Sequence, residues 1–243
     1  MRQPYPECSE CIAIPWCKLY SGEVTKTSAT AWCQAKFRLD KALALSDIPL
    51  EYHEANLSNY TVDKDNREVF EFLKPYVDNI VGEVDKGTNF FFYHTNPGSG
   101  KTYNACVLLN QFIYKTCLTE RFDFENPLAL FVEYPSLMHR LRYKRDDEET
   151  EKYVERVKSV PLLLIDDIGS GTTSEFTIEQ TYIILNHRFN HRLSTIITSN
   201  LSIQELRQPN VLAPRNVSRI LARCVGKEIG GRDRRMDWAR GSK

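Results

Sequence analysis

The stretch 90–102 reads Phe-Phe-Phe-Tyr-His-Thr-Asn-Pro-Gly-Ser-Gly-Lys-Thr, and it decides the fold of this chain. Its apolar first half is typical of a buried strand, and the apolar positions between Ala105 and Ile113 recur at the spacing of a helix. A strand, a glycine-bearing turn that ends in Gly-Lys-Thr and a following helix are the parts of a phosphate-binding loop. One position departs from the usual pattern, because Thr95 stands where the first glycine is expected.

This loop predicts a binding site for the phosphates of a nucleotide. The backbone N–H groups of a glycine-rich turn and the N-terminus of the following helix attract phosphate oxygens. Lys101 adds a flexible positive charge, and the Thr102 hydroxyl is placed to hold Mg²⁺. We expect the nucleotide to contact Asn96, Pro97, Gly98, Ser99, Gly100, Lys101, Thr102 and Tyr103. The alternative is a chance Gly-Ser-Gly-Lys turn in a surface loop.

Two further strand ends carry polar residues that suit the same site. The run 160–165 is uniformly apolar, which is typical of a strand covered on both faces, and Asp166 and Asp167 follow it. We expect Asp166 to hold Mg²⁺ and Asp167 to orient or deprotonate the attacking water. The β-branched run 195–198 leads to Asn200, which either senses the γ-phosphate or caps the next helix. The combination predicts an α/β fold in which a parallel sheet, flanked by helices, binds the ligand at its carboxyl edge.

Together these motifs resemble one family, the AAA+ helicase loaders of the DnaC/DnaI type with the related IstB-type transposition ATPases. The resemblance runs from about residue 48 to the C-terminus, and the segment 48–60 is similar to the signature that precedes the family's ATPase core. It implies an ATPase that binds a replicative hexameric DNA helicase and delivers it to single-stranded DNA during replication initiation. Asp167 is one methylene group shorter than the glutamate of fast AAA+ motors, so we expect slow, switch-like hydrolysis of ATP.

The C-terminal part of the chain is strongly basic, although the formal net charge of the whole chain is zero. In the family, a helix of the type Ser-Arg-Ile-x-x-Arg supplies an arginine finger to the nucleotide of the neighbouring subunit. The segment 218–223 matches this helix, so the resemblance implies self-association with Arg219 as the finger and Arg223 as the second choice. Arg234 or Arg235 resembles the sensor 2 region, and the alternative for these two is a solvated basic tail.

Cysteine usage sets the N-terminal segment apart. Four of the seven cysteines lie in the first 33 residues, at the spacing C-x2-C-x5-C-x15-C. No apolar segment of the signal-peptide type follows Met1, so we expect a cytoplasmic protein, in which clustered cysteines favour metal over disulfides. The predicted ligands of a tetrahedral Zn²⁺ site are Cys8, Cys11, Cys17 and Cys33. Some family members use a histidine at the place of Cys17, and an iron–sulfur site or unliganded thiols are the alternatives.

These markers divide the chain into two expected domains. Residues 1–47 would form a zinc-binding, helicase-interacting domain, and residues 48–243 the AAA+ ATPase domain, with 48–85 as connector and first helix. No membrane span or repeat is visible in the sequence. A basic cluster after the second expected strand is hypothesised to contact single-stranded DNA: His139, Arg140, Arg142, Lys144 and Arg145. Two other functions stay open, a transposition-type DNA-remodelling ATPase and a zinc-containing DNA-binding adaptor that binds ATP but barely hydrolyses it.

Overall fold

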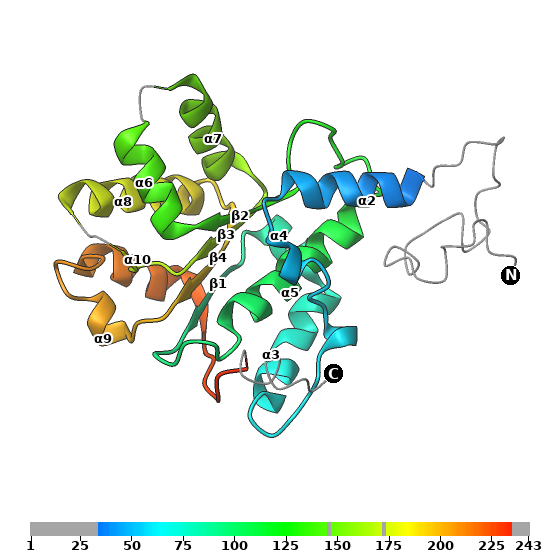
Figure 1. Cartoon of the computed structure of the whole chain (residues 1–243), viewed down its shortest axis with the longest axis horizontal. Helices are drawn as coiled ribbons and strands as arrows, with labels where there is room; N and C mark the ends of the chain where they lie inside the picture. Colours follow the sequence, from blue (N-terminus) through cyan, green and yellow to red (C-terminus); the bar gives the residue numbers. More distant parts are fainter. Residues whose placement is uncertain (1–33, 145–146, 172–173, 235–243) are drawn as a thin grey trace, which may run out of the picture.

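A parallel sheet with helices on both faces forms the described part of the chain, which comprises residues 34–144, 147–171 and 174–234 of a computed structural model (Figure 1). The five strands are β1 (Asn89–Tyr93), β2 (Ala129–Glu133), β3 (Leu162–Asp166), β4 (Ser194–Ser199) and β5 (Cys224–Glu228). Their order in the sheet is β2-β3-β4-β1-β5, and every neighbouring pair is parallel. The predicted α/β fold with a parallel sheet is therefore confirmed.

Alternate side chains of the strands contribute to two separate cores. In β1, Phe90 and Phe92 belong to one core and Phe91 belongs to the other. In β3, Leu162 and Leu164 belong to the first of these cores and Leu163 belongs to the second. Successive residues of a strand point to opposite faces, and a sheet covered on both faces has no solvent side. This arrangement explains why the strands appear in the sequence as uninterrupted apolar runs.

One face of the sheet is covered by the helices that precede β1 and by the helix that follows the phosphate loop (Figure 1). These are α2 (Gln34–Leu45), α3 (Arg67–Asp78), α4 (Ile80–Lys86) and α5 (Lys101–Thr116). The connector between α2 and α3 contains two short 3-10 helices, η3 (Leu50–Tyr52) and η4 (Leu57–Asn59). The amide of Asn110 on α5 donates hydrogen bonds to the backbone oxygens of Tyr52 at 2.6 Å and Ala55 at 3.0 Å, which fixes the connector against the helix.

The other face is covered by helices from the second half of the chain (Figure 1). These are α6 (Tyr134–Tyr143), α7 (Glu148–Ser159), α8 (Glu175–Asn190), α9 (Ile203–Leu206) and α10 (Pro214–Arg223). None of the helices in the described ranges is long and apolar enough to cross a membrane.

The helix α2 belongs to the ATPase core, although the expected domain boundary lies after it at residue 47. Leu39, Ala42 and Leu43 are buried in the same core as α5. Just beyond α2, the backbone oxygen of Ser46 accepts a hydrogen bond at 2.8 Å from the N–H group of Phe131 in the edge strand β2. The packed core thus begins before residue 48. The division into two domains stays a prediction, and the cysteines at positions 8, 11, 17 and 33 lie outside the described residues.

Candidate nucleotide-binding site

The phosphate loop joins the carboxyl end of β1 to α5, and its backbone conformation requires glycine at two positions. Gly98 has a φ angle of +72° and Gly100, the N-cap of α5, has a φ angle of +99°. Residues other than glycine rarely adopt positive φ angles of this size. Thr95 is not among the described residues with positive φ, so a β-branched residue at the usual place of the first glycine does not strain the backbone here.

Lys101 is folded back into the loop, with only 4% of the residue exposed. Its Nζ atom donates hydrogen bonds to the backbone oxygen of Asn96 at 2.9 Å and to Oγ of Ser99 at 3.3 Å. These neutral oxygens are weaker partners for an ammonium group than the charged oxygens of a phosphate. The ammonium group of Lys101 therefore lies inside the phosphate loop.

Asp166, the last residue of β3, is a nearly buried carboxylate beside the phosphate loop, with 8% of the residue exposed. Its Oδ1 atom accepts a hydrogen bond at 2.7 Å from Oγ1 of Thr198, and the Thr102 hydroxyl is a further hydrogen-bond partner. Burial raises the pKa of Asp166 to about 6 against the opposing effect of the Thr198 hydrogen bond, and the charge of Asp167 adds to the rise.

A divalent cation suits this buried carboxylate. Mg²⁺ is commonly held by one or two carboxylates together with phosphate oxygens and water. The hydroxyl of Thr102, a hydrogen-bond partner of Asp166, lies beside this carboxylate. In the part of the chain that the structure describes, no group of three or more His, Cys, Asp and Glu side chains is arranged to hold a metal ion. A Mg²⁺ ion bound with a nucleotide does not need such a group.

Asp167 is turned away from the strand direction by its backbone. Its φ angle is +57°, a region in which Asp is one of the better tolerated residues. The N–H group of Asp167 donates to Oγ1 of Thr198 at 2.9 Å. Its Oδ1 atom accepts a hydrogen bond from Nδ2 of Asn200, which follows β4. The structure thus brings together the two residues that the sequence assigns to the attacking water and to the γ-phosphate.

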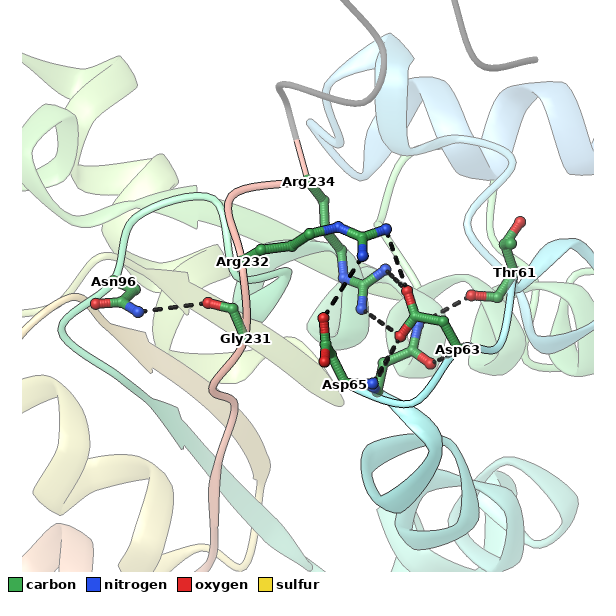
Figure 2. A network of polar contacts seen from close by, with 8 residues as sticks. Thr61, Asp63, Asp65, Asn96, Gly231, Arg232 and Arg234 are labelled. Carbon is green, nitrogen blue, oxygen red and sulfur yellow. Dashed lines mark hydrogen bonds and ion pairs between the residues drawn. The ribbon is translucent and has the colours of Figure 1, made fainter. Parts of the chain in front are cut away.

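The segment after β5 crosses the phosphate loop (Figure 2). The N–H group of Arg234 donates to the backbone oxygen of Gly98 at 3.0 Å, and Nδ2 of Asn96 lies 3.4 Å from the backbone oxygen of Gly231. A Cβ atom added to Gly98 would lie 1.8 Å from Oδ1 of Asp233, so glycine is required here for space as well as for conformation. Arg234 is therefore next to the loop, while Arg235 lies outside the described residues.

Two acidic residues of the connector hold the arginines of this segment (Figure 2). Arg234 makes two hydrogen bonds of 3.0 Å to the carboxylate of Asp63. Arg232 lies 3.4 Å from Asp63 and 3.6 Å from Asp65. The hydrogen bond from Arg234 is the largest cause that lowers the pKa of Asp63 to about 2. No sequence pattern points to Asp63, because an isolated acid in a connector is typical of a solvated residue.

Arg219, the expected arginine finger, is directed toward α8. Its guanidinium donates to Oδ1 of Asn186 at 2.7 Å and to the hydroxyl of Tyr182 at 3.2 Å. It also lies over the Tyr182 ring, 4.8 Å from the centroid, and Arg215 lies 4.7 Å from the same centroid. Arg223 is exposed at the end of α10. These contacts do not involve the phosphate loop of the same chain, and the finger role of Arg219 stays a prediction.

Two of the arginines hypothesised to contact DNA have partners within the chain. Arg140 stacks over the Tyr153 ring at 4.5 Å and donates to Oγ1 of Thr150 at 3.1 Å. Arg142 donates to Oγ of Ser174 at 2.6 Å. Binding of DNA through these side chains would have to compete with the intramolecular contacts. The DNA contact at this cluster stays a hypothesis.

The sheet order, the phosphate loop after β1, the carboxylates after β3 and the polar residue after β4 define a P-loop ATPase fold of the AAA+ type. The chain belongs to the family of IstB-like ATP binding proteins, whose sequence model matches residues 59–238. This match confirms the resemblance stated from the motifs.

Curated relatives and solved structures agree with this assignment. The chain is 26% identical over 180 residues to the replicative helicase loader DnaI of Bacillus subtilis (strain 168), which is 70% of this chain and 53% of DnaI. The crystal structure of the DnaC helicase loader is similar with a TM-score of 0.61 and 26% identity, over 75% of this chain and 100% of that one. The structure of DnaI has a TM-score of 0.60 and 24% identity, over 80% and 99% of the two chains. The chain thus spans about half the length of the curated DnaI relative.

Proposed function

We propose that this chain is an ATP-dependent loader that binds a replicative hexameric DNA helicase and delivers it to single-stranded DNA. Membership of an ATP-binding family and the names of the relatives support the proposal. The observation that carries the ATPase part of the proposal is the convergence of the site residues at the carboxyl ends of three neighbouring strands, β3, β4 and β1. These residues are Lys101, Thr102, Asp166, Asp167 and Asn200.

In the proposed reaction, water attacks the γ-phosphate of ATP in line with the leaving group. Lys101 and the N–H groups of the loop bind the phosphates, and Thr102 and Asp166 would hold Mg²⁺, which supplies positive charge against the phosphate oxygens. Asp167 orients the water and accepts its proton, and Asn200 contacts the γ-phosphate. Arg219 of a neighbouring copy offsets the charge that develops in the transition state. The short Asp167 side chain favours slow hydrolysis, which suits a switch.

The zinc-binding segment belongs to the same proposal. Cys8, Cys11, Cys17 and Cys33 would hold Zn²⁺, and the small domain that they organise would contact the helicase. Helix α2 would then connect the two domains, because it begins directly after Cys33 and packs into the ATPase core through Leu39, Ala42 and Leu43. A helicase bound to the N-terminal segment would be attached to the core through this helix.

Two measurements test the proposal. Turnover of ATP is measured for the parent, for Lys101→Ala and Asp166→Asn, and for the control Lys86→Ala, which changes an exposed lysine on α4. We expect turnover to be lost in the first two variants and kept in the control. The protein is then used to capture partners from extract of its own cells, and we expect a replicative helicase, identified by mass. Capture of a transposase would instead support a transposition ATPase, and ATP binding without turnover would support an adaptor.

A further inference from the structure

Thr198 connects the two aspartates that follow β3, although it carries none of the expected chemistry itself. It lies on β4, the strand next to β3, and it is fully buried. Its hydroxyl donates a hydrogen bond to Oδ1 of Asp166 at 2.7 Å. The same oxygen accepts a hydrogen bond from the N–H group of Asp167 at 2.9 Å. One side chain is thus bound to the carboxylate of the first aspartate and to the backbone of the second.

Each of these two bonds restricts a different freedom. The terminal torsion of a carboxylate is broad and roughly two-fold, so an Asp166 side chain without the Thr198 hydroxyl could turn its oxygens away from Thr102. The left-handed backbone of Asp167, with a φ angle of +57°, is held only if the surrounding contacts favour it. That conformation directs the Asp167 carboxylate to Asn200. Without the Thr198 oxygen, the N–H group of Asp167 would lose this hydrogen bond.

We propose that Thr198 is a positioning residue that gives the two aspartates their separate tasks. Its hydroxyl proton fixes the Asp166 carboxylate for the metal ion bound with the nucleotide, and its oxygen fixes the Asp167 backbone for the attacking water. The inference rests on the proposed ATP hydrolysis and adds a residue to that site. Thr198 acts through the two aspartates and does not itself contact substrate.

A purely structural role is the competing explanation, and the neighbouring residue provides a matched control. Ser199 is also fully buried on β4, and its hydroxyl donates to the backbone oxygen of Ile168 at 2.8 Å. It therefore ties β4 to the segment after β3 just as Thr198 does, but its hydroxyl is bonded to neither aspartate. Loss of the Ser199 hydroxyl measures the effect of removing such a tie from this strand.

The test compares Thr198→Val, Thr198→Ser and Ser199→Ala with the parent protein. Binding of Mn²⁺ is measured by electron paramagnetic resonance in the presence of a non-hydrolysable ATP analogue, and nucleotide affinity is measured separately in EDTA. Hydrolysis is followed against Mg²⁺ concentration. Loss of an orienting partner of a metal ligand commonly lowers metal affinity 10- to 100-fold, so we expect Thr198→Val to weaken Mn²⁺ binding by about tenfold or more. Nucleotide affinity in EDTA should stay within about twofold of the parent, because the phosphate loop is unchanged.

Thr198→Ser keeps the hydroxyl and is expected to bind Mn²⁺ as the parent does, and Ser199→Ala should leave Mn²⁺ binding unchanged. Thr198→Ala replaces the valine variant if the latter does not fold. Parental Mn²⁺ affinity in the valine or alanine variant, or an equal loss in Ser199→Ala, would overturn the assignment of Thr198. If the parent protein binds and hydrolyses ATP, that result leaves the proposed function intact. If the parent binds no nucleotide, both proposals fall.

Discussion

Arg234 and Asp63 are 171 positions apart in the chain, and they form a bidentate ion pair in which both hydrogen bonds measure 3.0 Å. The backbone N–H group of Arg234 is bonded at the same time to Gly98 in the phosphate loop. This residue therefore joins three segments: the connector, the phosphate loop and the chain after β5.

The ion pair predicts that Asp63→Asn lowers the free energy of unfolding by about 1 to 2 kcal/mol, because a charge-assisted pair becomes a neutral contact in a partly exposed place. The folded pKa of Asp63 is depressed to about 2, so its contribution is complete above the usual value of 3.8 and is lost as pH falls toward 2. Denaturant titrations of variant and parent should therefore differ at pH 6 and converge near pH 2. Asp65→Asn is the control, since Asp65 lies 3.6 Å from the exposed Arg232. An equal loss in the control would contradict the special role of the Arg234 pair.

For Asp166, we expect the contribution to the free energy of unfolding to change with pH in the opposite direction. Burial raises its folded pKa above the usual value of 3.8, so the stability that the protonated form contributes is present below pH 4 and lost as pH rises through about 6. The rise corresponds to about 3 kcal/mol for the ionised form in the protein without metal and nucleotide. Asp166→Asn should thus be more stable than the parent at pH 8 and similar to it at pH 4. Denaturant titrations in EDTA measure the difference, and a difference that does not change with pH would contradict the buried, ionisable Asp166.

Arg219 predicts complementation between two inactive variants. Lys101→Ala lacks a working nucleotide site but keeps the finger, and Arg219→Ala keeps the site but lacks the finger. If the finger acts on the neighbouring copy, each variant alone should lose at least about tenfold in turnover and a mixture should regain activity. Arg223→Ala in the same mixing assay decides between the two arginines. Weaker ATP binding by the isolated Arg219→Ala chain would indicate a role within the same subunit and would contradict the proposal.

The residues that could be predicted from the sequence are those whose chemistry depends on a short local pattern. Gly98 and Lys101 lie in one turn, and Asp166 ends one apolar strand, so periodicity and spacing were sufficient. Asp63 and Thr198 acquire their roles from partners that are 171 and 32 positions away, and no local pattern distinguishes them from a solvated acid or a strand threonine. The parallel sheet was predictable because its strands are apolar on both faces. The inclusion of α2 in the core could not be predicted, because the sequence of a short amphipathic helix does not indicate which domain the helix packs against.

Because α2 packs into the core, the position at which the N-terminal segment is cut off should affect the stability of the remaining chain. A chain that begins at Ile48 loses Leu39, Ala42 and Leu43 from the core, and burial of each leucine stabilises the fold by about 1.5 to 3 kcal/mol. We therefore expect this chain to unfold at a clearly lower denaturant concentration than the 243-residue chain. A chain that begins at Gln34 keeps α2 and should match the 243-residue chain in stability and in ATP binding. Equal stability of the two truncated chains would contradict the burial of α2.

The chain that begins at Gln34 also tests how the tasks are divided between the two expected domains. It lacks Cys8, Cys11, Cys17 and Cys33, so we expect it to hold no zinc and to lose the helicase while it still binds ATP. Cys8→Ser in the 243-residue chain should reproduce both losses, because the folding energy of a small metal-bound domain is largely the energy of binding the metal. Zinc content by atomic absorption and co-purification with the helicase are the two measurements, and Cys117→Ser, a buried cysteine after α5, is the control. Recruitment of the helicase by the truncated chain would place the contact on the ATPase domain, and zinc retained in it would rule out the N-terminal site.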